Sequence, residues 1–257
     1  GADIINSSLG YTTFDDTTQN HTYLDMNGKT TPISIGAGIA CKKGIIVVNS
    51  AGNSGNSNWH YIGAPADNSD VLTVGAVDEN AEIAAFSSYG PNSEGYLKPN
   101  IVAQGKNTVI VNSDNRIITG NGTSFAAPIN AGMIACLWGA NVAESAFNIK
   151  DAIYKSADRY LNPDMQYGYG IPDYYEALKL LSGDLDLFEN GDVFNFTSDS
   201  EKKVSFEVYC TDGRVVSKGS FSSPFLWQDI IPKSAGTYIV RFHSEGYEFV
   251  KKYIVSE

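Results

Sequence analysis

Charged residues and long apolar runs are both scarce in this chain. Only 18% of its 257 residues are charged, and no run approaches the roughly 18 consecutive apolar residues of a membrane-spanning helix. The first residues, Gly1 to Ile5, lack the basic start and the apolar stretch of a signal peptide. We interpret them as a strand and expect the chain to begin within a domain. With 42% hydrophobic residues, the sequence is too apolar for a disordered chain, and at about 150 residues per domain its length predicts one large or two modest domains.

Basic residues and cysteines are also few. There are 18 Lys and Arg against 29 Asp and Glu, a net charge of −11, which argues against nucleic-acid binding because phosphates require basic side chains. The three cysteines, Cys41, Cys136 and Cys210, form no CxxC pair, so no structural zinc site is expected. We expect buried free thiols in place of a disulfide.

The order of apolar segments predicts an α/β fold for residues 1–183. Strand and helix patterns follow one another here, which indicates a parallel sheet with helices on its faces. The expected strands are 2–9, 45–48 and 71–77, and residues 11–31 are expected to form a long loop. One helix is expected to begin at Pro32 and to end near Lys42–Gly44. Three further helices are expected at 125–140, 144–158 and 172–182. Pro128 is placed in the first turn of its helix, where proline is tolerated.

The pattern changes after Gly183. Residues 204–209 alternate between apolar and polar, and the Thr211–Arg214 segment is typical of a hairpin turn. Further short strands are expected at 237–242 and 249–255. The sequence therefore predicts a second domain, residues 184–257, that forms a small antiparallel β-sandwich.

Two polar residues are candidates for a ligand site, one at the start of a helix and one at the end of a strand. Ser124 opens the apolar helix, near free backbone N–H groups and the positive end of the helix dipole. Asn53 follows a buried strand in a glycine-rich turn, at the strand end where α/β sheets bind ligands, and its amide could donate to an oxyanion. Taken singly, each residue has a commoner structural role: helix N-cap for Ser124 and turn residue for Asn53.

Taken together, the segments around these residues resemble the subtilisin-like serine proteases, the subtilase family. The matching segments occur in the family's order over residues 1–182: GADIINSSLG (1–10), IVVNSAGN (46–53), VLTVGAVD (71–78), FSSYGP (86–91), KPNIVAQG (98–105), GNGTSFAAP (120–128) and YGIP (169–172). A lone GTS triplet would be a weak signal, whereas seven ordered segments are a strong one. The resemblance implies a partial subtilisin-like parallel sheet with flanking helices, which precedes the β-sandwich predicted from the strand pattern.

The resemblance also implies roles for individual residues. Ser124 aligns with the acylating nucleophile and Asn53 with the oxyanion-hole donor, which the backbone N–H of Ser124 would assist. The Ser8, Leu9 and Gly10 segment looks like the strand that pairs with the substrate backbone, and the segment Ser50, Ala51 and Gly52 looks like one wall of the primary specificity pocket.

The acid and base of the catalytic triad have no counterpart in this sequence. Subtilases carry them in the order Asp, His, Ser, so we expect both motifs upstream of Gly1. His21, His60 and His243 lie in other contexts, although His60 could border the substrate cleft. Because a serine without a base is a weak nucleophile, the chain alone is predicted to be inactive. It is interpreted as the C-terminal part of a secreted or cell-surface serine endopeptidase; the alternative is a non-catalytic pseudoprotease that binds peptides as a scaffold.

The remaining predictions concern partners, the tail and metals. The exposed sheet is expected to be covered by the N-terminal part of the same protease or by a second copy of the chain, and the substrate is a peptide or protein. Residues 184–257 resemble the C-terminal sorting domains of the type IX secretion system; the alternative is a generic accessory sandwich. No cofactor is predicted. Calcium at Asp15, Asp16 and Asp25 of the long loop is the alternative, whereas Asp184, Leu185, Asp186 and Glu189 lack EF-hand spacing and are interpreted as a solvated linker.

Overall fold

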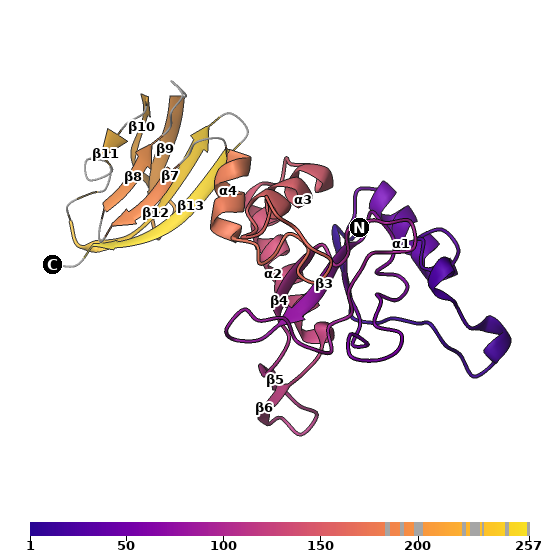
Figure 1. Cartoon of the computed structure of the whole chain (residues 1–257). Helices are drawn as coiled ribbons and strands as arrows, with labels where there is room; N and C mark the ends of the chain where they lie inside the picture. The colour runs from indigo at the N-terminus through magenta and orange to yellow at the C-terminus, as the bar shows by residue number, and fades with distance from the viewer. Residues whose placement is uncertain are drawn as a thin grey trace. The chain divides into compact units, whose positions relative to one another are not determined.

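The chain folds into two compact units, which are described separately. The computed structural model describes residues 1–182, 186–190, 193–197, 203–222, 225–226, 232, 234–244 and 247–255. The first unit comprises Gly1–Leu137 and Ser145–Ala177, and the second comprises Trp138–Glu144 and Leu178–Glu257 (Figure 1). The predicted boundary near residue 183 stays a prediction, since residues 183–185 are outside the described part.

A four-stranded parallel sheet forms the centre of the first unit. Its order is β1 (Ile4–Ser7), β2 (Ile46–Ser50), β3 (Leu72–Val77) and β4 (Ile101–Gln104). Every residue of β2 and β3 is buried, as expected for strands covered on both faces. The prediction of a parallel sheet with flanking helices is confirmed.

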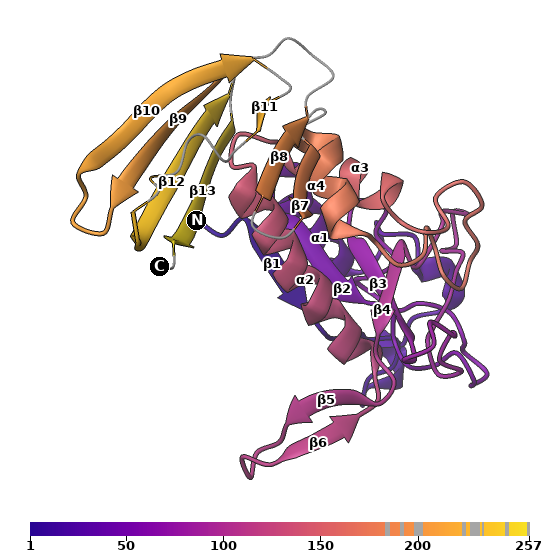
Figure 2. The same cartoon turned by 90° about the vertical axis from the view of Figure 1, so that its left-hand side faces the viewer.

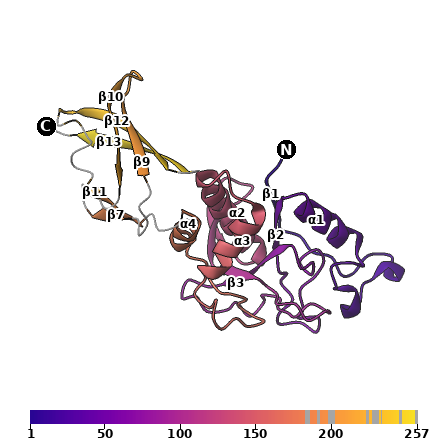
Figure 3. The same cartoon turned by 90° about the horizontal axis from the view of Figure 1, so that it is seen from above.

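Helices cover both faces of this sheet. Helix α1 (Pro32–Lys42) lies on one face and α2 (Thr123–Ala140) on the other (Figures 2 and 3). The α1 helix begins where the sequence predicted, because the Thr31 hydroxyl accepts the Ser34 N–H at 3.3 Å and Pro32 occupies the first turn. Two shorter helices follow, α3 (Ala146–Lys155) and α4 (Tyr174–Ser182).

The placement of Pro128 in the first turn of its helix was wrong. Helix α2 begins at Thr123, so Pro128 lies in the second turn. Proline has no N–H to donate to the carbonyl four residues back, which here is that of Ser124. The Ser8 hydroxyl donates to the Ser124 carbonyl at 3.0 Å instead. A residue outside the helix thus satisfies the carbonyl that proline leaves free.

The buried Lys98 joins the beginnings of two sheet strands. Its ammonium group donates to the Val71 carbonyl at 2.7 Å, to Thr73 Oγ1 at 3.0 Å and to Asn100 Oδ1 at 3.1 Å. These acceptors lie in or beside β3 and β4, so one side chain holds both strands. Complete burial lowers the pKa of Lys98 to about 7.

Two further parts of the first unit are irregular or peripheral. The long polar loop contains two short 3₁₀ helices, Thr17–Gln19 and Tyr23–Asp25. A hairpin of β5 (Thr108–Val111) and β6 (Ile117–Gly120) precedes α2 in the chain.

The second unit is mainly antiparallel β-structure. Its strands are β7 (Asp186–Asn190), β8 (Val193–Thr197), β9 (Lys203–Cys210), β10 (Val215–Ser222), β11 (Phe225–Leu226), β12 (Gly236–Ser244) and β13 (Tyr247–Val255). They pair as two sheets, β10-β9-β12-β13 and β11-β8-β7. Val208, Val240 and Phe242 are buried. The packing of the two sheets as a sandwich stays a prediction.

The three cysteines are free thiols, as predicted. The expectation that all of them are buried was wrong, because Cys136 is exposed on α2, while Cys41 and Cys210 are partly buried. Burial raises the pKa of the Cys41 thiol. None of the helices in the described part of the chain combines the length and apolarity needed to span a bilayer.

Candidate active site

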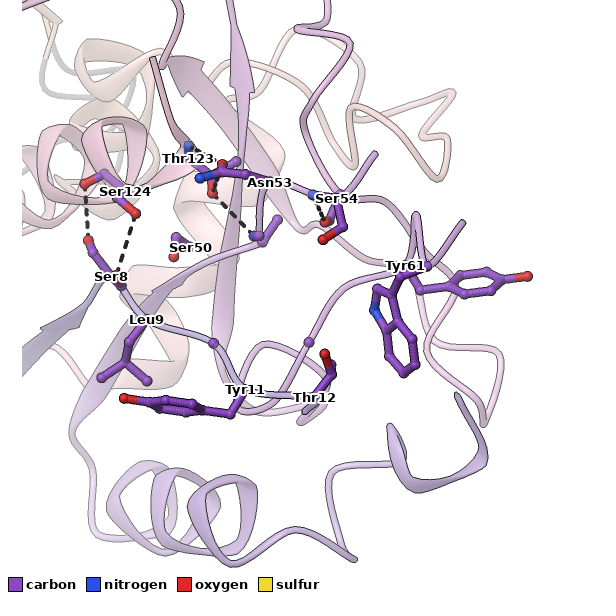
Figure 4. Close-up of a pocket in the computed structure, with 16 residues that line it drawn as sticks. Ser8, Leu9, Tyr11, Thr12, Ser50, Asn53, Ser54, Tyr61, Thr123 and Ser124 are labelled. Carbon is purple, nitrogen blue, oxygen red and sulfur yellow. Dashed lines mark hydrogen bonds between the residues drawn. The ribbon is translucent and has the colours of Figure 1, made fainter. Parts of the chain in front are cut away.

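One pocket of about 190 Å³ brings the predicted site residues together. It lies where the chain following β1, the turn after β2 and the start of α2 converge (Figure 4). All eight residues that the sequence singled out line it: Ser8, Leu9, Gly10, Ser50, Ala51, Gly52, Asn53 and Ser124. Segments more than a hundred residues apart in the chain therefore share one cavity.

Ser124 is held at the N-terminal end of α2 by a reciprocal contact with Ser8. The Ser8 hydroxyl donates to the Ser124 carbonyl at 3.0 Å, and Ser124 Oγ donates to the Ser8 carbonyl at 3.4 Å. The second contact is long, so it holds the Ser124 hydroxyl only weakly. Ser124 is half-buried and lies at the pocket wall, where a carbonyl carbon in the pocket could reach it.

The Asn53 side chain is oriented by the first residue of the same helix. Its Oδ1 accepts from the Thr123 N–H at 2.9 Å and from the Thr123 hydroxyl at 3.0 Å. Thr123 Oγ1 in turn accepts from the Gly52 N–H at 3.2 Å. Because the oxygen is engaged in this way, the Asn53 Nδ2 group is left as a donor, and none of the described residues accepts from it. The arrangement offers a fixed N–H donor beside Ser124.

The segment after β1 is tied to the sheet by side-chain and backbone bonds. Asn49 Nδ2 donates to the Leu9 carbonyl at 3.1 Å, and the Tyr11 N–H donates to the Ala64 carbonyl at 3.0 Å. Ser8, Leu9 and Gly10 are exposed between these points. The segment is therefore fixed in position and open to an incoming chain.

Two of the three histidines pack against aromatic rings of the first unit, and the third lies in the second unit. His21 packs edge-on against Phe14, with ring centroids 5.4 Å apart. His60 stacks on Tyr89, with a centroid separation of 5.2 Å, and His243 lies on β12 in the second unit. His60 is not among the residues that line the pocket, whereas its neighbours Trp59 and Tyr61 are, so its place at the border of the substrate cleft stays a prediction.

Sequence reasoning missed about half of the pocket lining. Tyr11, Thr12, Ser54, Trp59, Tyr61, Gly63, Ser88 and Thr123 also line it. Thr123, Ser54 and Tyr11 adjoin predicted site residues, and Thr123 and Ser88 also lie in segments that resemble the family, which were the available signals. Ser88 and Gly63 lie far from Ser124 in the sequence and reach the pocket only through the fold.

No group of three or more His, Cys, Asp or Glu side chains in the described residues is placed to hold a metal ion. Asp16 accepts from the Thr18 N–H at 3.0 Å and Asp25 from the Thr22 N–H at 2.7 Å. Hydrogen bonds from Thr18 and Thr22 lower the pKa values of these two carboxyls. Asp184 and Leu185 and the side chains of Asp186 and Glu189 lie outside the described part.

A protein-family model matches the larger part of this chain. The family model described as peptidase S8, subtilase family, matches residues 1–170. A thermophilic serine proteinase of Bacillus sp. (strain AK1) is 32% identical over 178 residues, which are 69% of this chain and 38% of that protein. Serine protease AprX of Bacillus subtilis (strain 168) is 33% identical over 153 residues, 51% of this chain and 34% of AprX. The matched part of the chain thus spans less than two fifths of either relative.

Solved structures share the fold. The prenylagaramide maturation protease PagA is 26% identical, with a TM-score of 0.52 over 70% of this chain and 62% of PagA. The self-cleaved protease domain of PatA is 24% identical, with a TM-score of 0.54 over 71% of this chain and 63% of that domain. At this identity, the likeness to PatA concerns the fold alone.

Proposed function

The chain belongs to the subtilase family, and from this premise we propose that it supplies the nucleophile and the oxyanion donor of a serine endopeptidase. The observation that carries the proposal is the convergence of Ser124 and Asn53 on one pocket, with Asn53 Oδ1 engaged by the start of α2 and Nδ2 left to donate. A residue with a purely capping role would need only its oxygen.

In the proposed reaction, Ser124 Oγ attacks the carbonyl carbon of the cleaved peptide bond. The carbonyl oxygen becomes an oxyanion and accepts hydrogen bonds from Asn53 Nδ2 and the Ser124 N–H. The tetrahedral intermediate collapses to an acyl-enzyme as the amine leaves with a proton, and water then releases the acid. Each donor gains strength as negative charge develops on the oxygen, so both act mainly on the transition state.

The proton of Ser124 needs a base that the residues of the first unit do not provide. The Ser8 carbonyl, at 3.4 Å, is the acceptor of the Ser124 hydroxyl, and a carbonyl oxygen is too weak a base to remove its proton. We propose that the histidine base and the aspartate of the triad come from outside this chain. The isolated chain would then have an assembled oxyanion hole and an unactivated nucleophile.

Assays of hydrolysis test this proposal directly. We expect no measurable peptide hydrolysis by the isolated chain, and hydrolysis by the longer polypeptide that contains it together with a histidine base. The Ser124→Ala variant of that longer protein should be inactive, while Ser113→Ala, at an exposed position of the β5–β6 hairpin, should retain full activity. Cleavage by the isolated chain that a serine-directed phosphonate abolishes would contradict the proposal, and an inactive longer protein would favour the peptide-binding scaffold.

The exposed Ser8–Gly10 segment provides a place for the substrate backbone. It continues from a strand, is held by Asn49 and Ala64, and runs beside Ser124. An extended peptide can add to such a segment by main-chain hydrogen bonds. We propose that the peptide or protein substrate binds here, with the cleaved bond over Ser124.

We also propose a partner for the edge of the parallel sheet. Among the described strands β1 pairs with β2 alone, and Ile5 on β1 is exposed. Apolar side chains are exposed on the flanking helices as well: Ile35 and Ile39 of α1 and Ile129 and Met133 of α2. A strand from the rest of the protease, or from a second copy of the chain, would pair with β1 and cover part of this apolar surface.

Light scattering on the isolated chain tests the exposed edge. We expect concentration-dependent self-association, because the unpaired edge of β1 and its apolar surroundings remain available. The Ile5→Lys variant should associate less, since the charge would have to be buried at the new contact. A monomeric wild-type chain of ordinary stability would count against a partner at this edge.

The tail and the location of the protein remain proposals as well. We propose that residues 184–257 act as a sorting or accessory domain and that the protein is secreted or displayed at the cell surface. The short strands of the second unit and the sequence likeness of its segments to sorting domains support this. A protease that is still exported after deletion of 184–257 would exclude the sorting role.

A further inference from the structure

The pocket is lined by a hydroxyl group that has no hydrogen-bond partner among the described residues. Ser50, the last residue of β2, lines the pocket and is only 4% exposed. None of the described residues forms a hydrogen bond with its hydroxyl group, which is therefore available to a polar group that enters the pocket. Figure 4 draws Ser50 between Ser8 and Ser124 on one side and Asn53 on the other. Its position thus points to a ligand group in the pocket as the missing partner.

Two further hydroxyls in the pocket lining have unused hydrogen-bonding capacity. Ser88 is 1% exposed, and its Oγ accepts from the Ser54 N–H at 3.0 Å, which leaves its O–H free to donate. Thr12 Oγ1 has no hydrogen bond within the described part of the chain. Thr12 lies across the pocket from Asn53 in Figure 4. Hydroxyls therefore reach the cavity from several sides.

The lining carries no charge. Its side chains are small, hydroxylic or aromatic, and none of the sixteen lining residues drawn in Figure 4 is acidic or basic. A charged ligand side chain would lose its hydration here without gaining a counter-ion. A wholly apolar one would leave the Ser50 hydroxyl buried without a partner. The aromatic walls suit methylene groups or flat groups.

We propose that this pocket selects a neutral carboxamide side chain, that of glutamine or asparagine, on the residue preceding the cleaved bond. A carboxamide has two N–H donors and an oxygen with two acceptor sites, the largest hydrogen-bonding capacity of any neutral side chain. Hydroxyl groups both donate and accept, so Ser50, Ser88 and Thr12 can serve either end of the amide. The inference rests on the proposed function, since it takes the pocket beside Ser124 as the specificity pocket.

Three peptides of matched length test the preference. They differ only in the C-terminal residue, which is Gln, Met or Glu, so they compare an amide with an apolar and a charged side chain of similar size. Their free carboxylate mimics the cleaved product and can bind at Asn53, so the isolated chain suffices, without catalysis. Fluorescence anisotropy with labelled peptides gives the affinities. We expect the Gln peptide to bind about tenfold more tightly than the Met peptide, the effect of roughly one hydrogen bond, and the Glu peptide to bind most weakly.

Variants connect the preference to the pocket. Ser50→Ala should weaken binding of the Gln peptide several-fold, leave the Met peptide unchanged, and leave the unfolding temperature unchanged because the hydroxyl has no partner in the protein. Gly63→Leu should remove the difference between the Gln and Met peptides. A Cβ at Gly63 has ordinary contacts, the nearest being 3.5 Å from Thr12 Cγ2, so a larger side chain can extend into the pocket. Ser113→Ala, outside the lining, is the control and should bind all three peptides as the wild type does.

The outcomes separate the inference from the proposed function. If the Met or Glu peptide binds as tightly as the Gln peptide, or if the preference survives Gly63→Leu, the carboxamide inference is overturned while the peptide site stands. If none of the three peptides binds, the substrate site of the proposed function fails, and the inference fails with it.

Discussion

Replacing Asn53 by alanine is expected to lower kcat of the assembled protease by about 10²–10³, a magnitude taken from loss of the corresponding asparagine in subtilisin. The physical reason is that Asn53 Nδ2, which donates to none of the described residues, would gain its acceptor only when the oxyanion forms. KM should change little, because the carbonyl oxygen of the bound substrate accepts only a weak hydrogen bond from Asn53 before the oxyanion forms. Steady-state kinetics on the longer polypeptide with its histidine base would measure both constants.

The Asn53→Asp variant distinguishes catalysis from helix capping. A carboxylate oxygen can still accept the Thr123 N–H and hydroxyl, but it offers no N–H to the oxyanion. We expect Asn53→Asp to lose as much turnover as Asn53→Ala, whereas only alanine should lose the capping contribution of about 1 kcal/mol. Thermal unfolding reports the second effect. Full turnover by Asn53→Asp would refute the oxyanion role.

Gly168→Ala is expected to destabilise the first unit by about 3 kcal/mol, the combined effect of left-handed backbone strain and overpacking. Gly168 has a φ of +62°, and a Cβ there would clash with the carbonyl oxygens of Asn100 and Pro99. These are backbone atoms just before β4, so they cannot move away without displacing the strand. Urea unfolding followed by tryptophan fluorescence would measure the loss.

Gly95→Ala is the matched control for this effect. Gly95 has a φ of +85° but nothing within 4 Å of a Cβ, so alanine there adds backbone strain alone, about 1 kcal/mol. The difference between the two variants isolates the close approach of Gly168 to β4. If both variants lose the same free energy of unfolding, the backbone before β4 moves to accommodate the new methyl group, which would contradict the expected close contact.

The sequence correctly predicted those elements whose formation depends on interactions between neighbouring residues. The α1 helix begins at Pro32 because of Thr31 and the proline itself, both readable from the letters. The buried strands β2 and β3 are short β-branched runs, again a local pattern. Pro128 was misplaced because proline is tolerated in the second turn only with the help of Ser8, a residue 120 positions away. The Ser8 hydroxyl donates a hydrogen bond to the Ser124 carbonyl, which Pro128 leaves without its helical partner.

The same distinction between local sequence signals and contacts made only in the fold applies to the candidate site. Ser124 and Asn53 could be selected in advance because the GTS and AGN segments resemble a known family, and that resemblance already contains information about the fold. Gly63 could not, since it lies outside the seven segments that resemble the family, and Ser88 lies inside one of them, FSSYGP, to which no role was assigned. The unpaired hydroxyl of Ser50 was equally unforeseeable, because a missing hydrogen bond is a property of everything around the side chain.

The sequence by itself determined the family, the parallel sheet with its helices, and the two polar residues that meet at the strand ends. The tertiary structure alone decided how Asn53 is oriented, which hydroxyls surround the pocket, and that His21 and His60 pack against aromatic rings. The physical reason is that helices and strands follow from patterns over neighbouring residues. A hydrogen-bond donor in a pocket is set by contacts between segments that only the folded chain brings within a few ångströms of each other.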